Sequence, residues 1–80
     1  MMQKIIIDYI TAEFMQGQED LSLTAEDDLL MTGLIDSIGM MKLIAFIEQK
    51  FEVKVQPQDM TIENFINVEA IGLFIENQQH

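Results

Sequence analysis

Apolar residues recur at spacings of three and four along most of this chain, and that spacing is typical of amphipathic helices. Near the N-terminus, one helical face carries most of the apolar residues, while Lys4, Asp8 and Thr11 lie on the opposite face. Glycine often follows the last turn of a helix, so Gly17 favours a helix end. The pattern predicts a first helix ending near Gly17, whose inner face consists of Gln3, Ile6, Ile7, Ile10 and Phe14.

Three further helices are predicted, and a side chain able to accept hydrogen bonds from free backbone N–H groups precedes each of them. Between the second and third helices, residues 51–56 alternate apolar and polar side chains but have no partner strand, so they read as an extended connector ending at Pro57. The predicted helices and their caps are Ser37 to Lys50 or Phe51 with Asp36 or Ser37, a short helix ending at Phe65 with Thr61, and Val68 to about Asn77 with Asn67.

A long, acidic connection occupies residues 16–36. A loop of this length without its own anchors is unusual in a compact domain. Thr24 followed by Asp27 resembles an N-cap pair and predicts a short helical turn within it. The fold class predicted is an all-α, small four-helix bundle of three longer helices and one short helix, with this long loop between the first and second helices. The expected anchors of the loop are Leu21, Leu23, Leu29, Leu30 and Leu34.

Composition narrows the classes of protein further. Eighty residues predict a single domain over residues 1–80, and the absence of cysteine rules out disulfides and thiolate metal sites. A net charge of −10 repels nucleic acid, so no nucleic-acid partner is expected. That charge either favours basic protein surfaces or simply keeps the domain soluble. No apolar run approaches the roughly 20 residues of a membrane span, which predicts a cytoplasmic protein.

Metal binding is not expected. Glu26, Asp27 and Asp28 could form a loose cation site, but their spacing departs from that of a calcium loop and the glycine of such a loop is missing. A solvated acidic loop explains these three residues better.

The second predicted helix carries two apolar stripes. Successive residues are rotated by about 100° in a helix, so the two stripes lie on different sides of it. A second stripe beside Ser37 has the form of a docking face, but it is equally typical of a central helix packed on both sides. The core stripe consists of Met40, Leu43, Ile44, Ile47 and Phe51, and the second stripe of Ile38, Met41 and Ala45.

Ser37 lies at the start of this helix without any residue to activate it. A serine nucleophile needs a base, usually histidine, and the one histidine of the chain is its last residue, His80. The chain therefore has no predicted catalytic residue and is not expected to be an enzyme. Ser37 fits better as a hydroxyl that another protein modifies.

Residues 33–38, Gly-Leu-Ile-Asp-Ser-Ile, resemble the attachment motif of the acyl and peptidyl carrier proteins, whose usual form is Gly-x-Asp-Ser-Leu or a close variant. The resemblance covers roughly residues 21–75. Residues 61–65, Thr-Ile-Glu-Asn-Phe, are similar to a segment of stand-alone aminoacyl, D-alanyl and peptidyl carriers.

This resemblance implies that a phosphopantetheinyl transferase moves 4′-phosphopantetheine from coenzyme A onto Ser37, with Asp36 as the flanking motif residue. The thiol of that group would carry an acyl, aminoacyl or peptidyl group as a thioester. The implied partners are an adenylating enzyme that loads the chain and a downstream condensing enzyme or thioesterase, with the carrier itself a monomer. The implied partner-binding residues are Ile38, Met41, Lys42 and Ala45.

The resemblance favours a role in a nonribosomal-peptide or lipopeptide pathway. Carriers of bacterial fatty acid synthesis usually present several carboxylates on the second helix, and here Lys42 stands where one is expected. A specialised fatty-acyl or polyketide carrier remains as an alternative. From another class, an acidic helical inhibitor or immunity-type protein would act by surface complementarity and needs no special serine.

Overall fold

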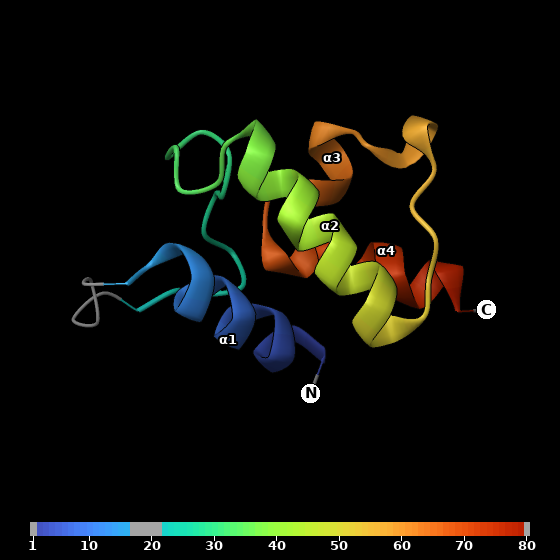
Figure 1. Cartoon of the computed structure of the whole chain (residues 1–80), viewed down its shortest axis with the longest axis horizontal. Coiled ribbons are helices and arrows are strands. Elements are labelled where there is room, and N and C mark those ends of the chain that lie inside the picture. The colour runs from blue at the N-terminus through green and yellow to red at the C-terminus, as the bar shows by residue number, and fades with distance from the viewer. Residues whose placement is uncertain (1, 17–21, 80) are drawn as a thin grey trace.

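A computed structural model describes residues 2–16 and 22–79, which form an all-helical bundle (Figure 1). No strand is present in these residues, so the predicted all-α class is confirmed. No helix in the described residues is long and apolar enough to cross a membrane. The elements are α1 (Met2–Phe14), α2 (Ser37–Phe51), the 3-10 helix η1 (Pro57–Asp59), α3 (Ile62–Phe65) and α4 (Val68–Gln78).

A single core holds the helices together. Helix α4 packs against α1 and α3, and α1 also contacts α2. Fully buried side chains from three helices meet in this core, and burying each contributes roughly 1.5–3 kcal/mol before the entropy cost of ordering it. The core is therefore built from the inner stripes of α1, α2 and α4. Its fully buried members on these helices are Ile6, Ile10, Leu43, Ile47, Val68, Ile71 and Ile75.

The predicted helix caps are confirmed. The Asp36 carboxylate accepts a hydrogen bond from the Gly39 N–H at 2.7 Å, so Asp36 rather than Ser37 caps α2. Thr61 caps α3 in the same manner, and Asn67 caps α4. Helix α1 ends at Phe14, before the predicted end at Gly17, a residue that lies outside the described part of the chain.

The loop before α2 is anchored by both side chains and backbone. Leu29 is fully buried, and its N–H donates to the Ile66 carbonyl at 2.7 Å. The Glu69 N–H donates to the Ala25 carbonyl at 3.0 Å, so the loop is tied to both ends of the α3–α4 junction. Ile35, which the sequence reasoning did not single out, is buried as well. Of the other expected anchors, Leu23 and Leu34 pack partly against the core, Leu30 is half-buried, and Leu21 lies outside the described residues.

Several expectations need correction. Gln3 was expected on the inner face of the first helix but is exposed, and Met40 of the core stripe is only half-buried. Phe51 was expected to be buried at the end of the inner stripe of α2, but it is only half-buried, because it is the last helical residue and packs at the edge of the core. The segment from Thr24 to Asp27 forms an isolated turn and not the expected short helical turn. In this turn the Asp27 carboxylate accepts a hydrogen bond from the Thr24 N–H at 2.8 Å.

Candidate functional site

Ser37 is the first residue of α2 and is exposed to solvent. Because the Asp36 carboxylate takes the capping bond from Gly39, the Ser37 hydroxyl is not needed for the helix start. An exposed hydroxyl that the cap does not need therefore lies at a helix N-terminus, where backbone N–H groups and the helix dipole favour a negatively charged substituent.

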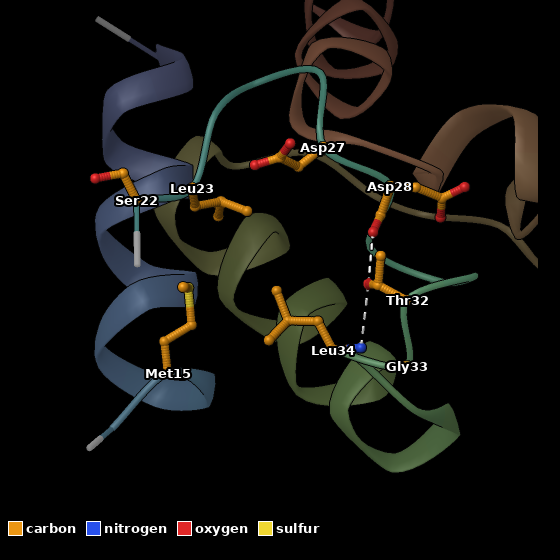
Figure 2. A pocket seen from close by; sticks show the side chains of 8 residues that line it. All are labelled: Met15, Ser22, Leu23, Asp27, Asp28, Thr32, Gly33 and Leu34. Carbon is orange, nitrogen blue, oxygen red and sulfur yellow. Dashed lines mark hydrogen bonds between the residues drawn. The ribbon is translucent and has the colours of Figure 1, made fainter. Parts of the chain in front are cut away.

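A tight turn from Asp28 to Gly33 lies shortly before Ser37 in the chain. The Asp28 carboxylate accepts hydrogen bonds from the N–H groups of Leu30 and Met31 at 2.9 and 2.7 Å. The Thr32 hydroxyl donates to the Asp28 carbonyl at 2.7 Å (Figure 2). Gly33 follows with a φ of +78°, a conformation that favours glycine. The glycine of the sequence motif therefore allows the backbone to turn at this position.

The pocket in Figure 2 is lined in part by residues of this turn and has a volume of about 570 Å³. The side chains of Met15, Leu23 and Leu34 face one another across it, with Asp27 and Asp28 at its edge. Both carboxylates already hold loop backbone N–H groups, as described above. Within residues 2–16 and 22–79, no group of three or more acidic or histidine side chains is placed to hold a metal ion.

Gly39 fixes how closely α1 approaches the start of α2. A β-carbon at this position would lie 2.8 Å from the Phe14 ring. The end of α1 therefore presses on the first turn of α2, two residues beyond Ser37. The sequence reasoning missed this role, because nothing in the sequence alone shows which glycine faces a neighbouring helix.

An aromatic pair supports the middle of α2. The Tyr9 and Phe46 rings stack with centroids 4.0 Å apart, and the Tyr9 hydroxyl donates to the Lys42 carbonyl at 3.4 Å. Burial, and to a lesser extent the Glu13 carboxylate, raises the pKa of Tyr9 above its ordinary value. Tyr9 can therefore keep its proton and this bond to a higher pH than an ordinary tyrosine would.

On the side of α2 facing α3, Ser37 borders an open hollow of about 660 Å³. Apolar side chains dominate its lining, and a smaller hollow of about 170 Å³ continues between α2 and α3. The two hollows share Leu30, Met40 and Met60, so an apolar path leads away from the serine. The larger hollow is lined by Leu30, Gly33, Ile35, Asp36, Ser37, Met40, Met41 and Met60.

The second stripe of α2 is open to solvent. Ile38 is 70% exposed and Met41 is 68% exposed, and both Lys42 and Ala45 are exposed as well. The alternative of a helix packed on both sides therefore does not hold for these residues. The structure brings all six predicted site residues onto the exposed surface at the start and middle of α2. Histidine is absent from the described residues, and His80 lies outside them.

The chain matches the protein family described as "Phosphopantetheine attachment site" over residues 7–74. It is 33% identical to the D-alanyl carrier protein of Streptococcus equi subsp. zooepidemicus (strain MGCS10565) over 78 residues, which are 98% of this chain and 95% of that one. It is 24% identical to the "Probable acyl carrier protein PigG" of Serratia sp. (strain ATCC 39006) over 76 residues, 95% of this chain and 86% of the other.

The fold also matches a solved structure. A chain in the crystal structure of an FAD-dependent dehydrogenase superposes with a TM-score of 0.79 and 30% sequence identity. The match covers 89% of this chain and 99% of that chain.

Proposed function

Because the chain belongs to the family of phosphopantetheine-binding carrier proteins, we propose that Ser37 is the residue that bears its covalently attached 4′-phosphopantetheine. The observation that carries this assignment is the exposed position of Ser37 at the N-terminus of α2, where Asp36 rather than Ser37 provides the cap. Family membership makes the chain a carrier of acyl or aminoacyl groups, and the assignment of Ser37 locates the point at which it carries them.

The residues around Ser37 suit this group. Its phosphodiester would lie at the N-terminus of α2, where free N–H groups and the helix dipole stabilise negative charge. Its pantetheine portion can run along the apolar hollow lined by Leu30, Met40 and Met60. The chemistry that the group supplies is a thiol that holds a carboxylic acid as a thioester.

We propose that the carried group is an aminoacyl or peptidyl group, in a nonribosomal-peptide or lipopeptide type of pathway. D-alanyl carriers are among the more similar relatives, at 33% identity over nearly the whole chain. The exposed face of α2 carries Lys42 and no carboxylate, unlike the acidic face usual in fatty acid synthesis. A fatty-acyl or polyketide carrier is the second candidate, favoured by the 24% identity to the acyl carrier of Serratia.

Carrier proteins of this family work with a phosphopantetheinyl transferase and with activating enzymes. For this chain we propose an adenylating enzyme as the loading partner and a condensing enzyme or thioesterase as the receiving partner. The similar chain in the dehydrogenase crystal structure adds an FAD-dependent dehydrogenase as a further candidate partner. We propose that the chain is a cytoplasmic monomer. It would have no catalytic activity of its own, because the sequence offers no base for Ser37: its single histidine is the last residue, His80.

The test of the attachment site is intact mass spectrometry after incubation with coenzyme A and a broad-specificity phosphopantetheinyl transferase. Wild type should gain one phosphopantetheinyl group, and Ser37→Ala should gain none. Ser37→Ala should lose about 1 kcal/mol or less in the free energy of unfolding, because Asp36 provides the cap. The control is Ser22→Ala, which changes the only other serine and should be modified like the wild type. Labelling of Ser22 would refute the assignment.

A further inference from the structure

From residue 29 to residue 35 the loop before α2 forms neither helix nor strand, yet nearly every N–H group in it donates a hydrogen bond. Backbone groups that are paired in this way fix the course of a loop much as a helix or a sheet does. The segment is therefore an ordered support for the residues that follow it. The N–H groups that donate are those of Leu29, Leu30, Met31, Gly33, Leu34 and Ile35.

Asp28 closes this segment through both its side chain and its backbone. Its Oδ1 atom accepts hydrogen bonds from the N–H groups of Leu30 and Met31, at 2.9 and 2.7 Å. Its carbonyl oxygen accepts from the Thr32 hydroxyl at 2.7 Å, and the oxygen of that hydroxyl accepts from the Leu34 N–H at 3.4 Å (Figure 2). No other residue of the segment takes part in as many of these bonds, so Asp28 is the residue on which the shape of the turn depends most.

The turn is connected to Ser37 through Ile35 and Asp36. The Ile35 N–H donates to the Leu29 carbonyl at 3.1 Å, and the Ile35 side chain is buried in the core. Asp36 follows directly and caps α2 with its carboxylate. Helix ends fray unless something holds them. The place of Ser37 in the first turn of α2 therefore depends on this cap and on the segment that carries it.

Attachment of phosphopantetheine requires an accurately placed serine. In the transfer, the Ser37 Oγ atom forms a bond to the phosphorus of the phosphopantetheine half of coenzyme A. The bond between that phosphorus and the bridging oxygen of the pyrophosphate breaks, and adenosine 3′,5′-bisphosphate leaves with the electron pair. The hydroxyl proton passes to a base of the transferase. A misplacement of the reacting atoms by about 1 Å can cost about a hundredfold in rate.

We propose that Asp28 is a positioning residue for this transfer, because by closing the turn it sets where Ser37 lies when the transferase binds. This inference rests on the proposed attachment at Ser37 and adds a residue that acts on the reaction from the preceding turn. The operative property of Asp28 is its hydrogen bonding and not its charge. Both side-chain bonds go to one oxygen, Oδ1, and an asparagine side chain offers an equivalent oxygen.

Two substitutions at this position separate the turn from the charge. Asp28→Asn removes the charge and keeps an acceptor for both N–H groups, whereas Asp28→Ala removes the charge and the acceptor. The control is Asp27→Ala, the same change at the neighbouring residue, whose carboxylate accepts from the Thr24 N–H in the earlier turn. Each carrier is incubated with coenzyme A and the broad-specificity transferase, and kcat and KM for the carrier are obtained from initial rates followed by intact mass spectrometry.

Asp28→Ala should lower kcat about tenfold to a hundredfold and leave KM within about threefold of wild type. Asp28→Asn and Asp27→Ala should keep both constants within about threefold of wild type, as surface substitutions usually do. The two constants distinguish positioning from a simple loss of stability. Because the carrier is the substrate here, a partly unfolded carrier would raise the apparent KM and leave kcat at saturation unchanged.

A second pair of substitutions tests the same turn if circular dichroism shows that Asp28→Ala does not fold. Thr32→Val removes the hydroxyl that donates to the Asp28 carbonyl and keeps the shape of the side chain, whereas Thr32→Ser keeps the hydroxyl. Thr32→Val should then lower kcat about tenfold, and Thr32→Ser should stay within about threefold of wild type. An unchanged kcat for Thr32→Val would overturn the proposal in that case.

With a folded Asp28→Ala, an unchanged kcat or a rise in KM alone would overturn the proposal. An equal loss of kcat in Asp28→Asn would overturn it as well, since the charge would then be responsible, and so would an equal loss in Asp27→Ala. If the wild type gains no phosphopantetheinyl group, the proposed attachment fails and this inference fails with it. A modified wild type without a specific effect at Asp28 refutes the inference alone.

Discussion

The two faces of α2 are both apolar, yet only one of them is buried. On the inner face Leu43, Ile44 and Ile47 are buried in the core. On the outer face Ile38 and Met41 are about two-thirds exposed. Both sets recur at spacings of three and four, so periodicity alone cannot distinguish them. The difference comes from neighbouring elements that cover one side of α2, and it leaves the uncovered side available beside Ser37.

The largest expected effect is on the inner face. Ile47→Ala should lower the free energy of unfolding by about 2–5 kcal/mol, because it leaves a cavity at a fully buried site. Chemical denaturation followed by circular dichroism measures this loss. Phe51→Ala is the comparison within the same stripe and should cost less, since Phe51 is half-buried. A larger loss for Phe51 than for Ile47 would show that the inner face is assigned wrongly.

An intermediate effect is expected where α1 presses on α2. Gly39→Ala adds a methyl group 2.8 Å from the Phe14 ring and should cost about 1–3 kcal/mol, as overpacking usually does. The same denaturation experiment measures it. In the double variant Gly39→Ala with Phe14→Leu, the smaller side chain should recover part of the loss. A stabilised Gly39→Ala would mean that helix propensity outweighs the close contact.

The smallest effect on stability is expected on the outer face. Met41→Ala should change the free energy of unfolding by less than about 0.5 kcal/mol, because Met41 is exposed. It should nevertheless slow loading by the adenylating enzyme, since exposed apolar anchors often carry much of the binding energy at an interface. Thermal melts and loading rates on the same variant separate the two quantities. A loss of several kcal/mol, or no change in loading, would contradict the division between the two faces.

Features governed by neighbouring residues were predicted well from the sequence. Thr61 and Asn67 cap the helices that were expected to follow them, and α2 begins at Ser37 as expected. A cap depends on one side chain and a backbone N–H group three residues away, so the necessary information is local. The positive φ of Gly33 is local in the same sense, because a glycine adopts it easily, but no turn was predicted at this residue.

Features that depend on distant contacts were not predicted. The role of Gly39 requires knowing that Phe14 lies above it. The half-buried state of Phe51 depends on how far the core extends along α2, which periodicity does not report. The backbone hydrogen bond from Leu29 to Ile66 cannot be recognised from the pattern of side chains, since any residue except proline can donate it.

That bond, and the one between Glu69 and Ala25, have a consequence for the timing of modification. Asp28 and Thr32 hold the turn before Ser37 locally, but the loop that contains it is anchored by backbone groups at Ile66 and Glu69, which leave the ribosome well after the serine does. Until those residues emerge, the segment ahead of Ser37 lacks the partners that shape it. We therefore expect a truncated chain that ends before Ile66 to be modified more slowly than the full chain, because its loop lacks these two anchors.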